Sequence, residues 1–266
     1  MAEFVRLEKI QKVYGTTVQT VALRGIDLAF QEGEYTAVIG RSGSGKSTLL
    51  NIIGALDRPT AGEMTVDGQR PFAMDDEALA KYRNRTLGFI FQFHYLLPEF
   101  NALENVLLPY RVFHGRLGPE VVRRAKDLVE RVGVGARMYN RSMNLSGGEQ
   151  QRIAIARSLI NNPRLILADE PTGNLDSDTS ESVKSLLREI NREFKTTFLI
   201  VTHDRHIAAG CDRVIEIDDG RVVKDMATAE FTKDEAWRQL APCNCRERQR
   251  GFSESTDSRT PTSTPR

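Results

Sequence analysis

The chain has 266 residues, 40% of them hydrophobic, which is enough for a full α/β core or for a core with one inserted subdomain. Its formal net charge is +1 and its acidic and basic residues are interspersed, which excludes a basic face for nucleic acid. No stretch approaches the roughly 18 apolar residues that span a bilayer, and the start, Met1-Ala2-Glu3-Phe4, lacks the pattern of a secretory signal. We therefore expect a cytosolic protein.

The N-terminal region, about residues 4–34, is predicted to form β-structure because its apolar positions alternate, as at Val5 and Leu7. A short apolar run then predicts a buried strand over 35–39, and a helix is predicted over 47–56. The segment between them therefore joins the end of a strand to the start of a helix.

That segment is a glycine-rich loop, Gly40-Arg41-Ser42-Gly43-Ser44-Gly45-Lys46-Ser47-Thr48. It fits the pattern G-x-x-x-x-G-K-[ST] in the strand–loop–helix context that the motif requires. The backbone N–H groups of such a loop surround phosphates, Lys46 would reach the β and γ oxygens, and Ser47 would be a ligand of Mg²⁺. Alone, the motif indicates only a nucleoside triphosphate site.

The middle of the chain is predicted to change from strands to helices. Strands are expected at 64–67 and 87–91, and Gln92 follows the second of them, where its amide would orient water or Mg²⁺. From there to Leu145 the pattern is helical, with a stripe of apolar residues at helical spacing at Val121, Val122, Ala125, Leu128, Val129 and Val132. We predict a helical subdomain inserted at about 93–145.

A second candidate phosphate site follows in the run Leu145-Ser146-Gly147-Gly148-Glu149-Gln150-Gln151-Arg152. Ser146 is placed to cap a helix that begins there, and the two glycines let a phosphate approach the free backbone N–H groups. An ordinary capped helix start is the alternative interpretation. Two separate anion sites, each half of a nucleotide pocket, indicate an ATP held between two copies of the chain.

Polar residues also follow two later apolar runs that predict buried strands. Asp169 and Glu170 end the run at 165–168, and His203 follows the run at 196–202. Adjacent residues of an extended chain point to opposite sides, so Asp169 is predicted to hold Mg²⁺ or its water and Glu170 to act as general base. His203 would lie at the same sheet edge, within reach of a γ-phosphate, although a histidine after a strand is more often a structural group.

From about residue 4 to 225 the chain resembles the ATP-binding subunits of ABC transporters. The resemblance covers six motifs in order: Walker A at 40–48, the Q-loop at Gln92, the signature at 145–152, Walker B at 165–170, the D-loop at Asn174-Leu175-Asp176, and the switch histidine at His203. It implies a P-loop ATPase core with an inserted helical subdomain, ATP and Mg²⁺ as cofactors, and a head-to-tail dimer. It further implies that Tyr14 stacks on adenine and that the signature residues and Asp176 contact the nucleotide from the partner copy.

The loop after Gln92 indicates which group of ABC transporter ATPases the chain most resembles. Its pattern of Leu-Leu-Pro at 96–98 and Leu-Glu-Asn-Val at 103–106 is similar to the ATPases that work with FtsX-like permeases. An aromatic-histidine pair before Pro98-Glu99-Phe100 most resembles the lipoprotein-releasing members, which implies a peripheral subunit on the cytoplasmic face of the inner membrane. A macrolide- or peptide-type exporter and a cell-division signalling ATPase remain as alternatives.

The C-terminal part is predicted to divide into a folded end and a polar tail. An Asp219-Gly220 turn predicts a hairpin, and beyond about Pro242 the chain is rich in Arg, Ser, Thr and Pro. We therefore expect one ATPase domain at 1–242 and a disordered segment at 243–266. The three cysteines fit a reducing compartment, with Cys211 packed in the core, and Cys243 and Cys245 alone cannot complete a tetrahedral metal site.

Overall fold

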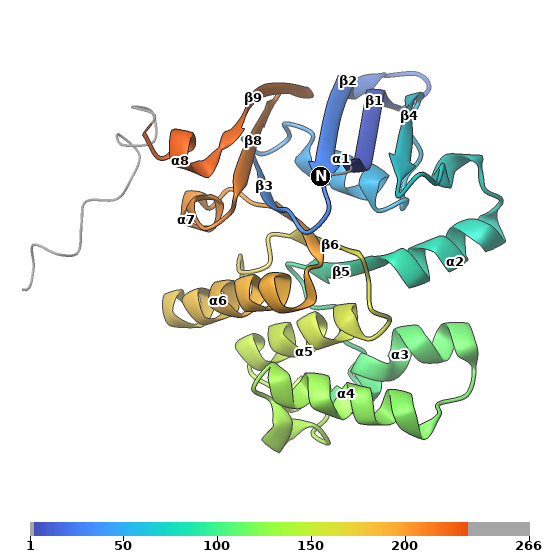
Figure 1. Ribbon diagram of the computed structural model, residues 1–266, viewed down its shortest axis with the longest axis vertical. Helices are drawn as coiled ribbons and strands as arrows, with labels where there is room; N and C mark the ends of the chain where they lie inside the picture. The colour runs from blue at the N-terminus through green and yellow to red at the C-terminus, as the bar shows by residue number, and fades with distance from the viewer. Residues whose placement is uncertain (1–2, 234–266) are drawn as a thin grey trace, which may run out of the picture.

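The computed structural model describes residues 3–233, and a six-stranded sheet lies at its centre (Figure 1). The strand order is β5-β6-β7-β3-β8-β9, with parallel pairing from β5 to β8 and β9 antiparallel to β8. The strands are β3 (Tyr35–Ile39), β5 (Leu87–Phe91), β6 (Leu165–Asp169), β7 (Thr197–Val201), β8 (Arg213–Asp218) and β9 (Arg221–Ala227). Strands buried on both faces are continuous apolar runs, which is why the sequence predicts the three central strands β3, β6 and β7.

The predicted N-terminal β region forms a separate antiparallel sheet. It contains β1 (Glu3–Tyr14), β2 (Thr20–Gln31) and β4 (Ala61–Val66), in the order β2-β1-β4. The strand expected at 64–67 begins earlier, at Ala61, because β4 pairs with β1 as far as Gln11. The predicted fold class, an α/β ATPase core with an N-terminal antiparallel region, is confirmed.

Different elements cover the two faces of the six-stranded sheet, so the protein has two apolar cores. Alternation along β3 places Ala37 and Ile39 in the first core and Val38 in the second. The first core includes residues of α3 (Ala102–His114), α4 (Pro119–Arg131), α5 (Gly147–Leu159), α6 (Ser177–Phe194), α7 (Arg205–Ala209) and α8 (Thr228–Phe231). The second includes residues of α1 (Lys46–Ile53), α2 (Asp76–Thr86) and the N-terminal sheet.

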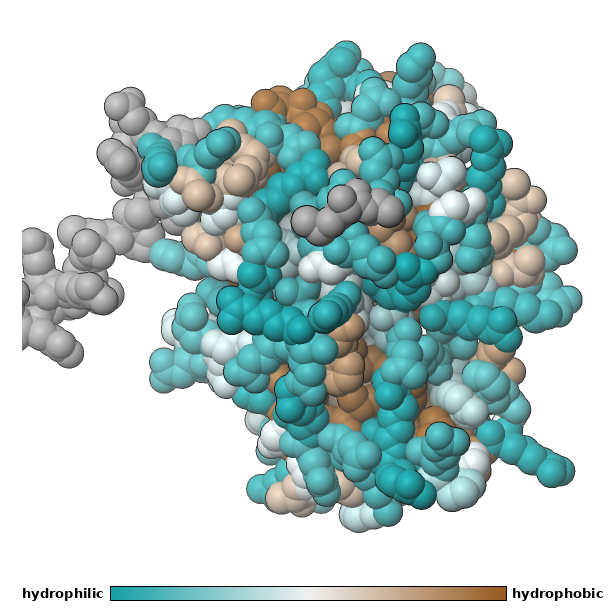
Figure 2. Space-filling model, viewed as in Figure 1, coloured by the Kyte–Doolittle hydropathy of each residue, from teal (hydrophilic) through white to brown (hydrophobic). Residues whose placement is uncertain are grey.

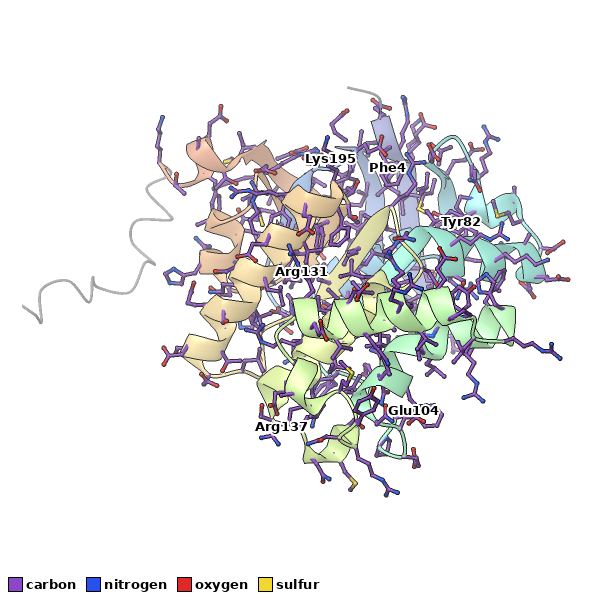
Figure 3. All side chains as sticks on the ribbon, turned by 60° about the horizontal axis from the view of Figure 1, so that its bottom comes forward. Phe4, Tyr82, Glu104, Arg131, Arg137 and Lys195 are labelled. Atoms are coloured by element: carbon purple, nitrogen blue, oxygen red, sulfur yellow. The ribbon has the colours of Figure 1, made fainter. Side chains whose placement is uncertain are left out.

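Figure 3 also shows that the elements of the two cores lie on different sides of the molecule. Phe4 and Tyr82, two members of the second core, lie on the side of β1 and α2, whereas Glu104 and Arg137 lie at the far end of the helical region (Figure 3). The described residues also contain three short 3₁₀ helices: η1 (Pro71–Ala73), η2 (Gly135–Arg137) and η3 (Ser142–Asn144). The segment predicted to be helical thus contains α3, α4, η2 and η3, although its status as a distinct subdomain stays a prediction.

Two helices differ from the sequence prediction. The sequence pattern does not predict α2, because only Leu79 and Tyr82 of its eleven residues are buried, too few for a stripe of apolar residues at helical spacing. Helix α1 ends at Ile53, three residues before its predicted end, where Gly54 is the C-cap. A Cβ at Gly54 would stand 2.7 Å from the ring of Phe89, so this turn requires a glycine.

The face shown in Figure 2 is mostly hydrophilic, with hydrophobic residues visible in patches. Among residues 3–233, no helix combines the length and the apolar character that crossing a bilayer requires. Cys211 is buried, and burial raises the pKa of its thiol to about 12, as fits a packing role. The polar tail, with Cys243 and Cys245, lies outside the described residues.

Candidate nucleotide site

Four neighbouring parallel strands place the predicted catalytic residues at one edge of the central sheet. In the order β5-β6-β7-β3, the carboxyl ends of these strands lead into Gln92, Asp169 with Glu170, His203, and the loop that begins at Gly40. Open parallel sheets bind ligands at this edge. The sequence therefore correctly predicts which of its segments converge there.

The backbone of the glycine-rich loop packs closely against β2 and β8. A Cβ at Gly40 would stand 2.1 Å from the carbonyl oxygen of Ile217, and one at Gly45, which has a φ of +106°, would stand 2.6 Å from that of Ala22. Gly45 is the N-cap of α1, and no side chain caps this helix start. Its first N–H groups therefore remain for an anion, which fits the phosphates of a nucleotide.

Lys46 lies beneath the loop. Its side-chain nitrogen donates to the carbonyl oxygens of Gly40, at 2.9 Å, and Arg41, at 2.8 Å. Burial lowers the pKa of Lys46, whereas the nearby carboxylates of Glu170 and Asp169 act to raise it. The lysine is thus a cation placed between the loop and the carboxylates, where a γ-phosphate would sit.

Asp169 and Glu170 have the separate environments that their predicted roles require. Burial raises the pKa of Asp169, and the charge of Glu170 raises it further, while Lys46 and a hydrogen bond from the Ser47 hydroxyl lower it. A hydroxyl paired with a carboxylate beside a phosphate loop is an oxygen donor set that suits Mg²⁺. Ser47 and Asp169 therefore fit the predicted metal site.

Glu170 is held in place by the end of β7. Its Oε1 accepts from the backbone N–H of His203 at 2.9 Å and lies 2.7 Å from the Nδ1 of that histidine, while Oε2 accepts from the Thr202 hydroxyl at 3.0 Å. The backbone of Glu170 has a φ of +45°, a left-handed conformation that is costly for a residue other than glycine. The structure thus joins Glu170 to His203, and it adds Thr202, which the sequence analysis did not identify.

Gln92 contacts the D-loop. Its Nε2 donates to the Oδ1 of Asn174 at 3.1 Å, and the Asn174 amide donates back to the Gln92 carbonyl oxygen at 3.1 Å. A Cβ at Gly173 would stand 2.9 Å from the Gln92 amide nitrogen, so a larger residue there would displace the end of the Gln92 side chain. The buried side chain of Gln151 connects α5 to the residue after Glu170, since its Nε2 donates to the Pro171 carbonyl oxygen at 2.6 Å. The sequence pattern does not predict this contact.

Tyr14 lies beside α1, with its side chain at hydrogen-bonding distance of Thr48. Its hydroxyl donates to Asp57 at 2.8 Å, and the Lys12 ammonium stands 4.9 Å from the ring centroid. The ring is 40% exposed. An exposed aromatic face next to the phosphate loop agrees with the predicted position of the base.

The signature residues lie elsewhere in the same chain. Ser146 caps α5 in a capping box with Glu149, and a Cβ at Gly148 would stand 2.5 Å from the Thr179 side chain of α6. Asp176 caps α6, with its two oxygens on the backbone and hydroxyl of Thr179. Because α5 belongs to the first core and α1 to the second, one chain holds the two predicted halves of the pocket on opposite faces of its sheet.

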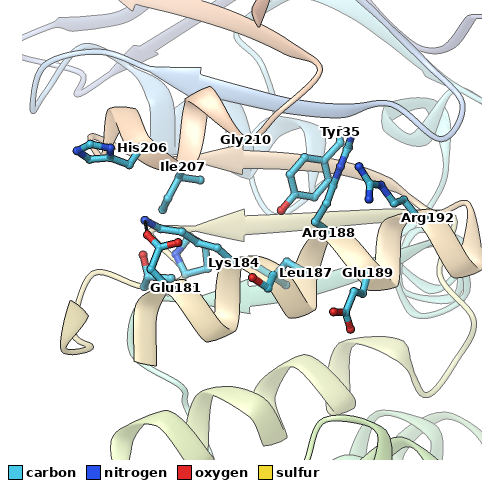
Figure 4. A pocket seen from close by; sticks show the side chains of 13 residues that line it. Tyr35, Glu181, Lys184, Leu187, Arg188, Glu189, Arg192, His206, Ile207 and Gly210 are labelled. Carbon is cyan, nitrogen blue, oxygen red and sulfur yellow. Dashed lines mark hydrogen bonds and ion pairs between the residues drawn. The ribbon is translucent and has the colours of Figure 1, made fainter. Parts of the chain in front are cut away.

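A cavity of 340 Å³ between α6 and α7 contains none of these predicted residues (Figure 4). Two of its cations are paired with carboxylates of the chain: Lys184 with Glu181 and Asp204, and Arg188 with Asp212. It is therefore distinct from the candidate nucleotide site.

Comparison with known proteins agrees with this geometry. The family model described as "ABC transporter" matches residues 23–173. The chain is 53% identical over 222 residues to the lipoprotein-releasing system ATP-binding protein LolD of Anaeromyxobacter dehalogenans, covering 83% of this chain and 93% of that protein. It is 49% identical over 224 residues to LolD 1 of Rhodopseudomonas palustris, covering 84% and 99%.

Solved structures show the same fold. The dimeric structure of the ABC transporter cassette MJ0796 is 42% identical, with a TM-score of 0.78 over 84% of this chain and 98% of that one. A second dimeric structure of MJ0796, in a post-hydrolysis state bound to ADP and Pi, gives 41% identity and the same TM-score. The chain belongs to the ABC transporter family, as an ATP-binding subunit.

Proposed function

We propose that this ABC ATPase powers the release of lipoproteins from a membrane, as a subunit of a complex with an FtsX-like permease. The observation that carries this proposal is the length of the match to LolD proteins, which are about half identical to this chain over nearly their whole length. The subunit would be peripheral, at the cytoplasmic face of the inner membrane. A macrolide- or peptide-type exporter and a cell-division signalling ATPase are the competing functions.

Each group of site residues has a separate role in ATP hydrolysis. The loop at 40–48 and Lys46 bind the phosphates, and Glu170 takes a proton from the attacking water. His203 orients Glu170 through the contact at Nδ1. Mg²⁺, held by Ser47, Asp169 and Gln92, would supply charge that stabilises the phosphate oxygens.

The second half of the pocket comes from another copy of the chain. The start of α5, with Ser146, Gly147, Gly148 and Glu149, would meet the γ-phosphate bound to the partner's loop, and Asp176 would lie at the same interface. The separation of α1 and α5 on opposite sheet faces supports this arrangement, because one chain alone does not bring the halves together.

The permease would dock in a groove beside the Q-loop. A groove of 460 Å³ is lined by residues of α2, α3 and α5 and by Phe89, Phe91 and Tyr95. Tyr95 belongs to the segment after Gln92, in which three large hydrophobic side chains are exposed: Phe93 by 61%, Tyr95 by 65% and Leu97 by 40%. Apolar side chains gathered at a groove are typical of a protein interface.

Replacing Leu97 with glutamate is expected to weaken assembly with the permease without changing ATP affinity. The side chain is exposed, so the charge costs little in the free subunit, but it would be buried without a partner at the interface. Pull-down with an FtsX-like permease and ATP binding by the free subunit measure the two effects. Val223→Glu, at an exposed position on β9, is the matched control and should assemble normally.

The lipoprotein assignment itself is tested by isolating the complex. The permease that co-purifies from the native host is identified by mass spectrometry and reconstituted with the subunit in vesicles that carry a lipoprotein. ATP-dependent release of the lipoprotein supports the proposal. Release of a macrolide or peptide instead, or hydrolysis without export of any of these, would favour one of the competing functions.

A further inference from the structure

The segment after the Q-loop is attached to the helix that carries the signature. Arg157, near the end of α5, donates from Nη2 to the His94 carbonyl oxygen and from Nη1 to that of Tyr95, both at 2.7 Å. The guanidinium is partly buried, and burial lowers its pKa. A buried cation whose donors fit two successive carbonyl oxygens fixes the path of that backbone.

The other end of α5 contacts the same segment. The side chain of His94 lies near the backbone of Gly147, in the first turn of the helix. Burial lowers the pKa of His94, the charge of Arg157 lowers it further, and the contact with Gly147 acts to raise it. His94 therefore lies against both ends of α5: its side chain is near Gly147 of the signature, and its carbonyl oxygen binds Arg157 nearly three turns away.

Exposure alternates along the same residues. Phe93, Tyr95 and Leu97 are exposed, whereas His94 and Leu96 turn inward and Leu96 packs against the first core. Arg157 thus holds the carbonyl oxygen of Tyr95, whose own ring is exposed, and that of His94, which lies between the exposed Phe93 and Tyr95. A shift of α5 has a direct path to this surface that does not pass through Gln92.

We infer that Arg157 is a positioning residue that makes residues 93–97 and the signature move as one body. This inference rests on the shared nucleotide site proposed above. When the signature closes on a nucleotide held by the partner copy, α5 carries the segment with it, and the apolar surface at Phe93, Tyr95 and Leu97 changes its position.

Hydrogen exchange tests this coupling without a permease. In full-length Glu170→Gln protein, addition of Mg-ATP should slow amide exchange at 146–149 and at 93–97 by factors that agree within about twofold, because a single body opens with one free energy. In Glu170→Gln/Arg157→Ala, the factor at 146–149 should persist while that at 93–97 falls to about one. Arg157→Lys, which keeps the charge but has one nitrogen for two carbonyl oxygens, should give an intermediate factor at 93–97 and serves if the alanine variant does not fold.

Arg124→Ala is the matched control. Arg124 also donates to two carbonyl oxygens at the end of α5, those of Leu159 and Ile160, but it makes no hydrogen bond to residues 93–97 within the described chain. Its variant should keep both responses to ATP. A purely structural role of Arg157 would speed exchange at 93–97 with and without ATP yet preserve the ratio, and that result would overturn the inference. Loss of the response at 146–149 in the parent protein would instead contradict the shared site itself.

Discussion

Glu170→Gln is expected to lower ATP turnover by about two to four orders of magnitude while leaving ATP affinity nearly unchanged. Glutamine keeps the size of the side chain and its hydrogen-bonding oxygen but cannot accept the proton of the attacking water. Lys46, the loop and the pair of Ser47 with Asp169 are untouched, so the phosphates and Mg²⁺ would still bind. The readouts are phosphate release at saturating ATP and nucleotide binding at equilibrium.

The same variant should accumulate as an ATP-bound dimer, because hydrolysis is the step that lets the copies part. Light scattering with and without Mg-ATP measures the change of mass. Thr202→Val removes a hydrogen bond to Glu170 without removing the carboxylate, and it should retain more turnover than Glu170→Gln. Turnover of the glutamine variant close to that of the unmodified protein would remove Glu170 from the role of general base.

Lys46→Ala and Ser146→Arg should each inactivate the protein, yet a mixture of the two variants should recover activity. Loss of one donor to a developing oxyanion costs about 10²–10³ in turnover, and we expect at least as large a loss for the Lys46 cation. An arginine at the start of α5 would block the approach of a phosphate. A mixed dimer holds one pocket with Lys46 and Ser146 both intact, one from each copy. Its second pocket carries both substitutions.

ATP-driven dimer formation is the primary readout of the mixing experiment, and phosphate release is the second. Each variant alone, at the same total concentration, is the control. Strict coupling between the two pockets would abolish hydrolysis in the mixture but not the nucleotide-dependent association. If the mixture neither associates nor hydrolyses ATP, the two halves do not form one pocket.

The sequence predicts the catalytic edge well because each of its parts is local. A buried strand is a continuous apolar run, and the residue that follows it lies at the carboxyl edge of the sheet irrespective of the rest of the sequence. This argument places Gln92, Asp169 and His203 at the carboxyl ends of β5, β6 and β7, where they lie in the structure. The contacts between these ends, such as Asn174 with Gln92 or Thr202 with Glu170, depend on the order of the strands in the sheet, which no local pattern encodes.

In the segment after Gln92, composition does not predict which apolar residues are exposed and which are buried. Its apolar residues, taken together, predict a partner surface, and the structure divides them: Leu97 is exposed, but Leu96 packs on the first core and Phe100 is partly buried. No helical period distinguishes them, because the segment is a loop. The backbone of the segment is bound by Arg157, which is 62 positions from Tyr95 in the chain, and no local pattern encodes a contact over that distance.

The contacts of Tyr14 bear on which nucleotide the protein accepts. Its hydroxyl is already engaged by Asp57, so the ring face is what the tyrosine offers to a base. Stacking on an aromatic face senses the area of a base and not the donors and acceptors on its edge, and guanine stacks as adenine does. We therefore expect GTP to be hydrolysed with a kcat/KM within about tenfold of that for ATP, a difference of about 1.4 kcal/mol, as measured by phosphate release with each purine. Whether the protein hydrolyses mainly ATP or GTP would then depend on the relative concentrations of the two nucleotides. A preference above about a hundredfold would require a group that hydrogen-bonds to the edge of the purine.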